Sequence, residues 1–309
     1  MNVILDVDTG VDDAFAILFA ARHPDIHLLG ITCVDGNTNL AQVVSNTLKV
    51  LDAAEAPEIP VSAGASRPLL GDSLYAEHVH GSDGLGDIDT PPSHRKVDSR
   101  PAVELIRDLI ESSKEPVTLI PLGPLTNIAL FLRSFPESAK KLKQIVLMGG
   151  SASEGNATAT AEFNIWHDPE AAAVVFTSEV PITMYGLDVF MDLRMNMDYA
   201  RELMGSNHAP SIFGGKLIKS MLDRLQYEIT LGDYGAVATA LHPEWARCEN
   251  YKVIVDTTFG PNRGQTICDK RPLAFQKLDP HYEDAKRCDV VLEIDAEKMR
   301  NLWLKTLGA

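Results

Sequence analysis

The residues of this sequence that are best suited to chemistry are carboxylates close to its beginning. Asp6, Asp8, Asp12 and Asp13 fall within eight residues, in the segment DVDTGVDD. Carboxylates this close repel one another unless a cation shares them, and hard divalent ions with oxygen ligands are the usual solution. An Asp at the start of a helix can also act as a cap, but that explains Asp12 or Asp13 and not all four residues. The segment therefore predicts a cation site.

Three kinds of site open in this way. An EF-hand is excluded, because the twelfth position counted from Asp6 is Ile17, where a bidentate Glu is required. A haloacid-dehalogenase-like phosphatase also begins with a strand and D-x-D, and it would use Asp6 as a nucleophile on phosphate. A hydrolytic site with one metal ion would use one Asp to hold the ion and another to take a proton from the water bound to it. On this segment alone the last two remain open.

The elements that must position this cluster follow from short apolar runs, rich in Val and Ile, that alternate with longer runs of helical period. We expect strands at Val3–Asp6, Leu28–Val34, Val117–Pro121, Ile145–Met148 and Ile182–Gly186. We expect helices at Asp12–Ala21, Asn39–Leu51, Thr126–Leu132, Pro169–Phe176 and Ser211–Tyr227.

This order predicts an α/β fold, with an open, mostly parallel, Rossmann-like sheet that carries helices on both faces. No shift in composition marks a boundary, so residues 1–309 are expected to form a single domain. Ligands of such folds bind where the carboxyl ends of several strands meet. The polar or glycine-rich segments that follow the strands are therefore expected to share one crevice. The stretch Leu70–Arg100 has little periodicity and predicts a long loop over that crevice.

Charge and composition exclude several classes of partner. The chain has 309 residues, with 28 Lys and Arg against 43 Asp and Glu, so its formal charge is −15. Nucleic-acid binding needs a basic surface, and we expect none here. No apolar run approaches the roughly 20 residues that span a bilayer, and no signal peptide is evident, so we expect a cytoplasmic protein without a membrane partner. The four cysteines are widely spaced and predict no zinc site.

Several loop motifs, taken in order, carry a family resemblance. After DVDTGVDDA come Gly36-Asn37, the segment GPLTN at 123–127, and the run from VLMGG at 146–150 to AEFN at 161–164. They are followed by DPEAA at 168–172 and GLD at 186–188, and more weakly by Asp233 and the C-terminal strand. In this order the motifs resemble the nucleoside hydrolase family, which includes inosine-uridine preferring enzymes.

The resemblance implies a tightly bound Ca²⁺ and hydrolysis of the N-glycosidic bond of ribonucleosides to free base and ribose. Asp8 would act as the base on a calcium-bound water. The implied metal ligands are Asp8, Asp13, the backbone carbonyl of Leu122, and Asp233. Residues that would hold or line the ribose are Asp12, Asn37, Met148, Asn156, Glu162, Phe163 and Asn164. The residue types fit this chemistry on their own, because carboxylates and amide oxygens grip hydroxyls and stabilise an oxocarbenium-like transition state.

Residues near the nucleobase are less clearly defined by the sequence. His80 matches a histidine of a mobile loop near the base, and we expect it to be a catalytic residue. Tyr227, at the end of the helix expected over Ser211–Tyr227, is expected to face the crevice and bind substrate. Many members of the family carry a histidine immediately before the late metal aspartate, where this chain has Gly232. Phe190 stands where the family often has a threonine.

The sequence thus predicts a calcium-dependent nucleoside N-ribohydrolase, with a small ribonucleoside as its partner. The resemblance also suggests a homodimer or homotetramer, and a role in purine or pyrimidine salvage. Gly232 supports one alternative, a ribosyl-binding relative that is non-catalytic or has an altered specificity. The phosphatase is a weaker alternative, because the chain has no evident lysine motif that would hold a phosphoryl group.

Overall fold

The fold is built around one twisted sheet with helices on both of its faces. The computed structural model describes residues 1–226, 228–276, 279–280 and 285–308. Nine described strands pair in the order β10-β9-β11-β6-β5-β4-β1-β2-β3. They are β1 Asn2–Val7, β2 His27–Cys33, β3 Val61–Ala63, β4 Val117–Pro121, β5 Leu142–Met148, β6 Ile182–Tyr185, β9 Ala246–Val255, β10 Thr266–Asp269 and β11 Arg287–Ile294.

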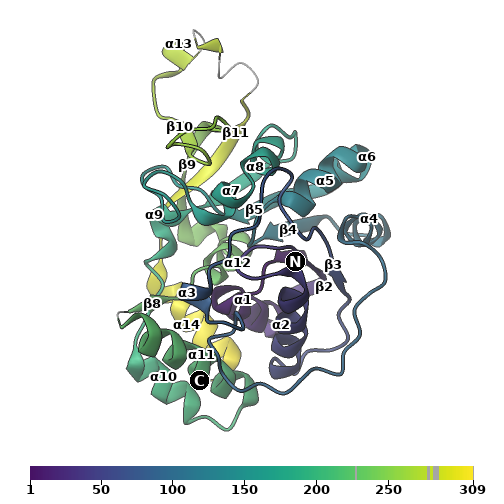
Figure 1. Cartoon of the computed structure of the whole chain (residues 1–309), viewed down its shortest axis with the longest axis vertical. Coiled ribbons are helices and arrows are strands. Elements are labelled where there is room, and N and C mark those ends of the chain that lie inside the picture. Colours follow the sequence, from purple (N-terminus) through teal and green to yellow (C-terminus); the bar gives the residue numbers. More distant parts are fainter. Residues whose placement is uncertain (227, 277–278, 281–284, 309) are drawn as a thin grey trace.

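The pairing of these strands confirms the predicted α/β class. Strands β3, β2, β1, β4, β5, β6 and β11 run parallel, and only β9 runs antiparallel to its two neighbours. The order β3-β2-β1-β4-β5-β6 reverses direction at β1 and β4, which is the switch point where doubly wound sheets bind ligands. Strands β9 and β10 were not foreseen and extend the sheet away from this point (Figure 1).

The helices follow the strands in the expected alternation. The longer ones are α1 Val11–Arg22, α2 Leu40–Ala53, α4 Ala102–Ser112, α5 Thr126–Ser134, α8 Pro169–Phe176, α10 Met197–Met204, α11 Ala209–Leu225, α12 Tyr234–Leu241 and α14 Ala296–Leu307. Short helices are α3 Glu77–His80, α6 Pro136–Ala139, α7 Phe163–His167, α9 Leu187–Phe190 and α13 Leu273–Gln276, with a 3₁₀ turn at Pro243–Trp245. A second small sheet pairs β7 Arg194–Met195 with β8 Ile229–Thr230.

Two apolar cores explain why β1 is so hydrophobic. Val3, Leu5 and Val7 face α1, α2 and α12, whereas Ile4 faces the core of α4, α5 and α8, and all four side chains are fully buried. Burial of each such side chain contributes about 1.5–3 kcal/mol. The C-terminal α14 closes the first core, because the Trp303 indole packs edge-on against another aromatic ring of α1 and donates to a backbone carbonyl there.

Register places the ends of the central strands side by side. Asp6 in β1 pairs with Thr32 in β2 and with Pro121 in β4, so the residues that follow these three strands emerge at one edge of the sheet. The stretch at 70–100 is mostly irregular, as predicted, and α3 is its one helix. Among the described residues, no helix is both long enough and apolar enough to cross a membrane.

Candidate active site at the carboxyl ends of β1 and β4

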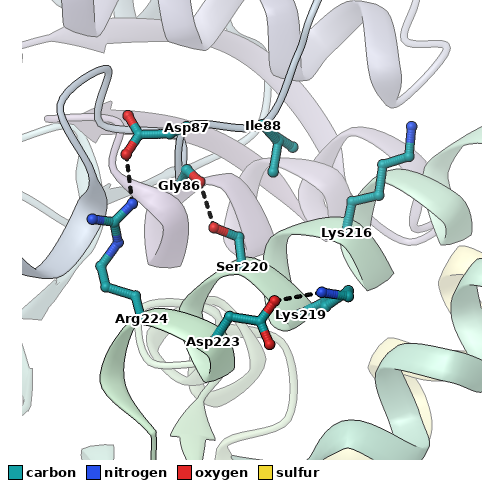
Figure 2. Close-up of a pocket in the computed structure, with 8 residues that line it drawn as sticks. All are labelled: Gly86, Asp87, Ile88, Lys216, Lys219, Ser220, Asp223 and Arg224. Atoms are coloured by element: carbon teal, nitrogen blue, oxygen red, sulfur yellow. Dashed lines mark hydrogen bonds and ion pairs between the residues drawn. The ribbon is translucent and has the colours of Figure 1, made fainter.

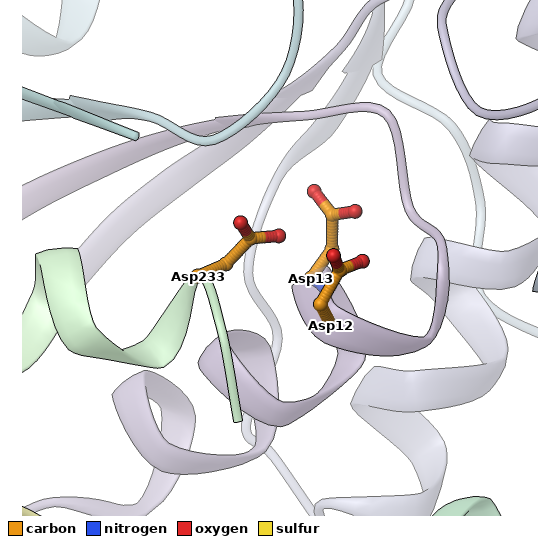
Figure 3. A group of neighbouring side chains, drawn as sticks. All are labelled: Asp12, Asp13 and Asp233. Carbon is orange, nitrogen blue, oxygen red and sulfur yellow. The ribbon is translucent and has the colours of Figure 1, made fainter. Parts of the chain in front are cut away.

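Three carboxylates gather where α1 and α12 begin. Asp12 and Asp13 lie in the first turn of α1, and Asp233 immediately precedes α12. One oxygen from each of the three lies within 4.8 Å of the others, which is an arrangement that can hold a metal ion (Figure 3). The side chains of Asp13 and Asp233 are buried, and Asp12 is half-buried. The sequence brought these residues together only through the family resemblance, since 220 positions separate Asp13 from Asp233.

Burial makes this cluster electrostatically costly. The pKa of Asp233 lies well above its usual value, first because the side chain is buried and then because Asp12, Asp13 and Asp8 are close. Burial, followed by the charge of Asp12, likewise raises the pKa of Asp13. A divalent cation would offset both effects, and all of the donors are oxygen atoms, which suit Ca²⁺.

Asp8 lies directly beside this cluster with one oxygen unused. Its Oδ2 accepts a hydrogen bond from the backbone N–H of Asn37 at 2.7 Å, whereas its Oδ1 is buried and has no hydrogen-bond partner. Burial, then the charges of Asp13 and Asp12, raise the pKa of Asp8 well above its usual range. A buried carboxylate oxygen without a partner is expensive, so this atom has the character of a ligand or a proton acceptor.

Two glycines that follow β4 and β2, the strands on either side of β1, enclose the Asp8 carboxylate. A Cβ atom on Gly123 would stand 2.7 Å from Oδ1, and one on Gly36 would overlap Oδ2. Both backbones can therefore approach the carboxylate only because neither residue has a side chain. Sequence reasoning gave these two glycines no function. Their positions in the loops after β4 and β2, within the motifs LGP and DGN, are the signal that could have revealed this role.

Asp6, the nucleophile of the phosphatase alternative, is held in the protein interior. Its Oδ1 accepts from Thr32 Oγ1 at 2.5 Å and from Asn127 Nδ2 at 2.8 Å, and burial raises its pKa to about 7. The amide of Asn127 also donates to the Cys33 carbonyl, so it ties β1 to β2. These contacts tie Asp6 Oδ1 to two neighbouring elements. Its Oδ2 is buried without a hydrogen-bond partner, as Oδ1 of Asp8 is, but Asp6 is not among the three carboxylates that gather at the cluster.

A second group of predicted residues surrounds the segment after β5. Glu162 caps α7, because its carboxylate accepts from the backbone N–H groups of Asn164, Ile165 and Gly150 at 2.9 to 3.2 Å. Burial raises the pKa of Glu162 to about 7. The Asn164 amide donates to the carbonyl oxygens of Leu122 at 2.7 Å and Met148 at 3.1 Å. The Leu122 carbonyl therefore lies at the site, where it already accepts one hydrogen bond.

The remaining predicted residues differ in burial. Asn37 is buried and donates from its side chain to Asp13 at 3.3 Å. Asn156 is exposed and accepts from the backbone of Phe163, whose ring is half-buried. Tyr227 lies outside the described residues. Tyr234, an aromatic residue next to Asp233, is fully buried in the core and donates its hydroxyl to a carbonyl of α14.

His80 reaches the site from the long loop. It is buried, and its Nδ1 accepts from the Val11 backbone N–H at 3.2 Å and lies 3.7 Å from Asp12 Oδ1. Burial lowers the pKa of His80, so the ring is neutral near pH 7. Because Nδ1 is the acceptor, the proton of the neutral ring is assigned to Nε2.

Several contacts fix this loop to the body of the protein. Arg224 of α11 forms an ion pair with Asp87 at 2.5 Å, and Ser220 of the same helix donates to the Gly86 carbonyl (Figure 2). The Gly86 N–H in turn donates to the His80 carbonyl at 2.7 Å. These residues line a surface pocket between the loop and α11. The loop is thereby held in the position that brings His80 to Asp12.

A further anchor of the loop was missed in the sequence. Asp35, directly after β2, is buried and accepts from Ser73 Oγ at 2.5 Å and from Tyr75 Oη at 3.3 Å. His167 Nε2 lies 3.4 Å from the same carboxylate, and neither of its ring nitrogens has a hydrogen-bond partner. A buried aspartate in the motif DGN at the end of a strand was the available signal.

Solved structures that share this fold include nucleoside hydrolases. A plant nucleoside hydrolase, PpNRh1, superposes with a TM-score of 0.92 at 28% identity, covering 100% of this chain and 99% of the other. A purine-preferring ribonucleoside hydrolase from Gardnerella vaginalis superposes with a TM-score of 0.90 at 32% identity, covering 99% of this chain and 98% of the other. The fold and the carboxylate cluster therefore define a hydrolase of N-glycosyl compounds.

Sequence comparison identifies the family. The model of the inosine-uridine preferring nucleoside hydrolases matches residues 3–301. The pyrimidine-specific ribonucleoside hydrolase RihB of Escherichia coli K12 is 39% identical over 274 residues, which is 87% of each chain. The chain belongs to the inosine-uridine preferring nucleoside hydrolase family. This result confirms the resemblance seen in the loop motifs and favours the hydrolase over the phosphatase alternative.

Proposed function

We propose that this protein hydrolyses the N-glycosidic bond of ribonucleosides with the help of one bound Ca²⁺, and that Asp8 is the general base. The observation that carries the proposal is the Asp8 carboxylate, whose buried Oδ1 has no partner and whose neighbours are carboxylates with raised pKa values. The ion would be held by Asp8, Asp13, the Leu122 carbonyl and Asp233. The observed grouping consists of Asp12, Asp13 and Asp233, and of these we assign Asp12 to the ribose.

Calcium, when bound, would supply a positive charge that makes water more acidic and orders hydroxyl groups around it. Asp8 Oδ1 would then take the proton from the attacking water, since its other oxygen is occupied by the Asn37 N–H. This division of roles needs an ionised Asp8 at neutral pH. A nearby cation lowers the pKa of a carboxylate that burial has raised.

The ribose would lie among the polar groups that rim the cluster. Asp12, Asn37, Asn156, Glu162 and Asn164 offer acceptors and donors for its hydroxyls, while Met148 and Phe163 supply apolar contact. As the glycosidic bond breaks, positive charge develops on the sugar, and the fixed carboxylates would stabilise it more than they stabilise the ground state.

The departing base gains negative charge and is better released with a proton. His80 is a candidate for this assistance through a hydrogen bond from its Nε2–H to the departing base, which would stabilise the charge that develops there. Complete proton transfer would need the imidazolium form of the ring, which the lowered pKa of the buried His80 disfavours. The oligomeric state, the cytoplasmic location and the role in salvage stay predictions.

Replacement of Asp8 by Asn tests the assignment of the base. The amide has nearly the same size but cannot take a proton, so we expect kcat to fall by at least about 100-fold. Base release from a ribonucleoside, followed by chromatography, measures the loss. Asp25→Asn, at an exposed position outside the site, is the matched control and should keep full activity. Full activity of Asp8→Asn would contradict the assignment. Nucleoside binding to the wild type without base release would favour the non-catalytic alternative.

A further inference from the structure

Phe190 and Gly232 meet at the edge of the carboxylate cluster. Gly232 precedes Asp233 and has a φ of +47°, a left-handed conformation that favours glycine. A Cβ atom at this position would stand 2.5 Å from Phe190 Cζ and 2.7 Å from Phe190 Cε2. On the same side it would stand 3.2 Å from the Cβ of Asp12. The end of the Phe190 ring thus occupies the space into which any side chain on residue 232 would point.

This contact is built into the backbone by a hydrogen-bonded bridge. Thr230 Oγ1 donates to the Phe190 carbonyl at 2.5 Å, and the same oxygen accepts from the Gly232 N–H at 3.1 Å. Phe190 lies at the end of α9, and Thr230 ends β8, so the bridge joins two separate segments. It links the backbone of Phe190 to the left-handed turn at Gly232.

The Phe190 ring lies near the carboxylate cluster. Phe190 is half-buried and packed against the core, and both the tip of its ring and the Cβ of Asp12 lie within 3.2 Å of the position that a Cβ on Gly232 would take. It therefore forms an apolar wall directly beside a polar cluster. Asp12 on one side and the ring on the other would contact different parts of one small molecule.

We infer that Phe190 is a specificity-determining residue, whose ring packs against the nucleobase of the bound nucleoside. This inference rests on the proposed function. With the ribose held by the carboxylates, the base is the only remaining part of the substrate, and it has an apolar face. Because the ring excludes a side chain at residue 232, this side of the site provides apolar contact for the base but no proton donor. Selection among bases at this wall then depends on the shape and area of the base.

Phe190→Ala tests the inference through substrate selectivity. Removal of an aromatic ring that contacts a base costs typically 1–3 kcal/mol, which corresponds to roughly 5- to 150-fold in affinity. We expect KM to rise by about ten-fold or more, by different factors for inosine and uridine, so that the ratio of their kcat/KM values changes. Phe190→Leu, which keeps apolar volume, should restore part of the loss. Phe259→Ala, at a 90% exposed ring far along the sequence, should change nothing.

Gly232→Ala tests the contact itself. Its Cβ would overlap the ring, so we expect the melting temperature to fall by several degrees in the wild type and by less in the Phe190→Ala background. If the wild type releases no base, the proposed function fails. If the wild type is active and Phe190→Ala keeps both its KM values and their ratio, the proposed function stands and the inference about Phe190 is wrong. If Gly232→Ala lowers the melting temperature equally in the wild type and in the Phe190→Ala variant, the proposed contact between Phe190 and residue 232 is wrong.

Discussion

Glu162→Gln removes one buried ionisable group while it keeps the size of the side chain. Glu162 is 3% exposed, and its carboxylate accepts hydrogen bonds from three backbone N–H groups. Burial nevertheless raises its pKa from 4.5 to about 7. A shift of this size corresponds to about 3 kcal/mol between the two protonation states.

The sign of the effect follows from linkage. A carboxyl group whose pKa is higher in the folded state stabilises the fold fully below its unfolded pKa, and this contribution is lost as the pH rises through its folded pKa. For Glu162 the loss therefore falls between pH values of about 4.5 and 7. Gln does not titrate, so the variant lacks this component of the pH dependence.

Urea unfolding at pH 5 and pH 8, in the presence of a chelator, measures the effect. We expect the free energy of unfolding of the wild type, minus that of Glu162→Gln, to decrease by about 2–3 kcal/mol from pH 5 to pH 8. Glu297→Gln, at an exposed position in the first turn of α14, should show no such change relative to the wild type. The same wild-type-minus-variant difference at both pH values would refute the reasoning about burial at this site.

Three further outcomes are expected. Gly36→Ala should displace the Asp8 carboxylate, because the new Cβ overlaps Oδ2, and the rate of base release should therefore fall at least about ten-fold. The control Gly260→Ala, whose Cβ would meet no atom within 4 Å, should leave that rate unchanged. Arg224→Ala should raise KM, because its ion pair with Asp87 holds the loop that carries His80. The melting temperature should change little, because this partly exposed ion pair contributes at most about 1 kcal/mol. An unchanged KM would contradict the role of the loop in positioning His80. Addition of Ca²⁺ to chelated protein should raise the melting temperature, because binding to the folded state relieves the carboxylate repulsion; no rise would contradict the cation site.

The sequence was most informative where one physical rule acts locally. Short apolar runs such as those of β1 and β4 are typical of strands buried in the middle of a parallel sheet. The ends of the predicted strands agree with the structure to within a few residues. The helix that begins near Asp12 was likewise expected, from the helical period of its apolar residues.

The parts that were not predicted depend on contacts between distant residues. Strands β9 and β10 have mixed burial and no clear alternation, so they are defined only by pairing, of β9 with β11 and of β10 with β9. The close approach of Gly36 and Gly123 to Asp8 involves three strand ends, and the contact between Phe190 and Gly232 spans 42 positions. No local pattern encodes such contacts. Only the family resemblance grouped Asp233 with the carboxylates near the beginning of the chain. From periodicity alone, Asp233 would have been interpreted as a helix cap.

Free ribose measured with and without a calcium chelator tests the central claim most directly. The protein is incubated with a panel of purine and pyrimidine ribonucleosides, first as prepared, then after chelation, and then after excess Ca²⁺ is restored. We expect ribose and free base to appear in equal amounts from at least one nucleoside, to cease on chelation and to return with Ca²⁺. Undiminished release of ribose in the chelator would contradict a calcium-dependent mechanism, and no release under any condition would contradict the proposed activity.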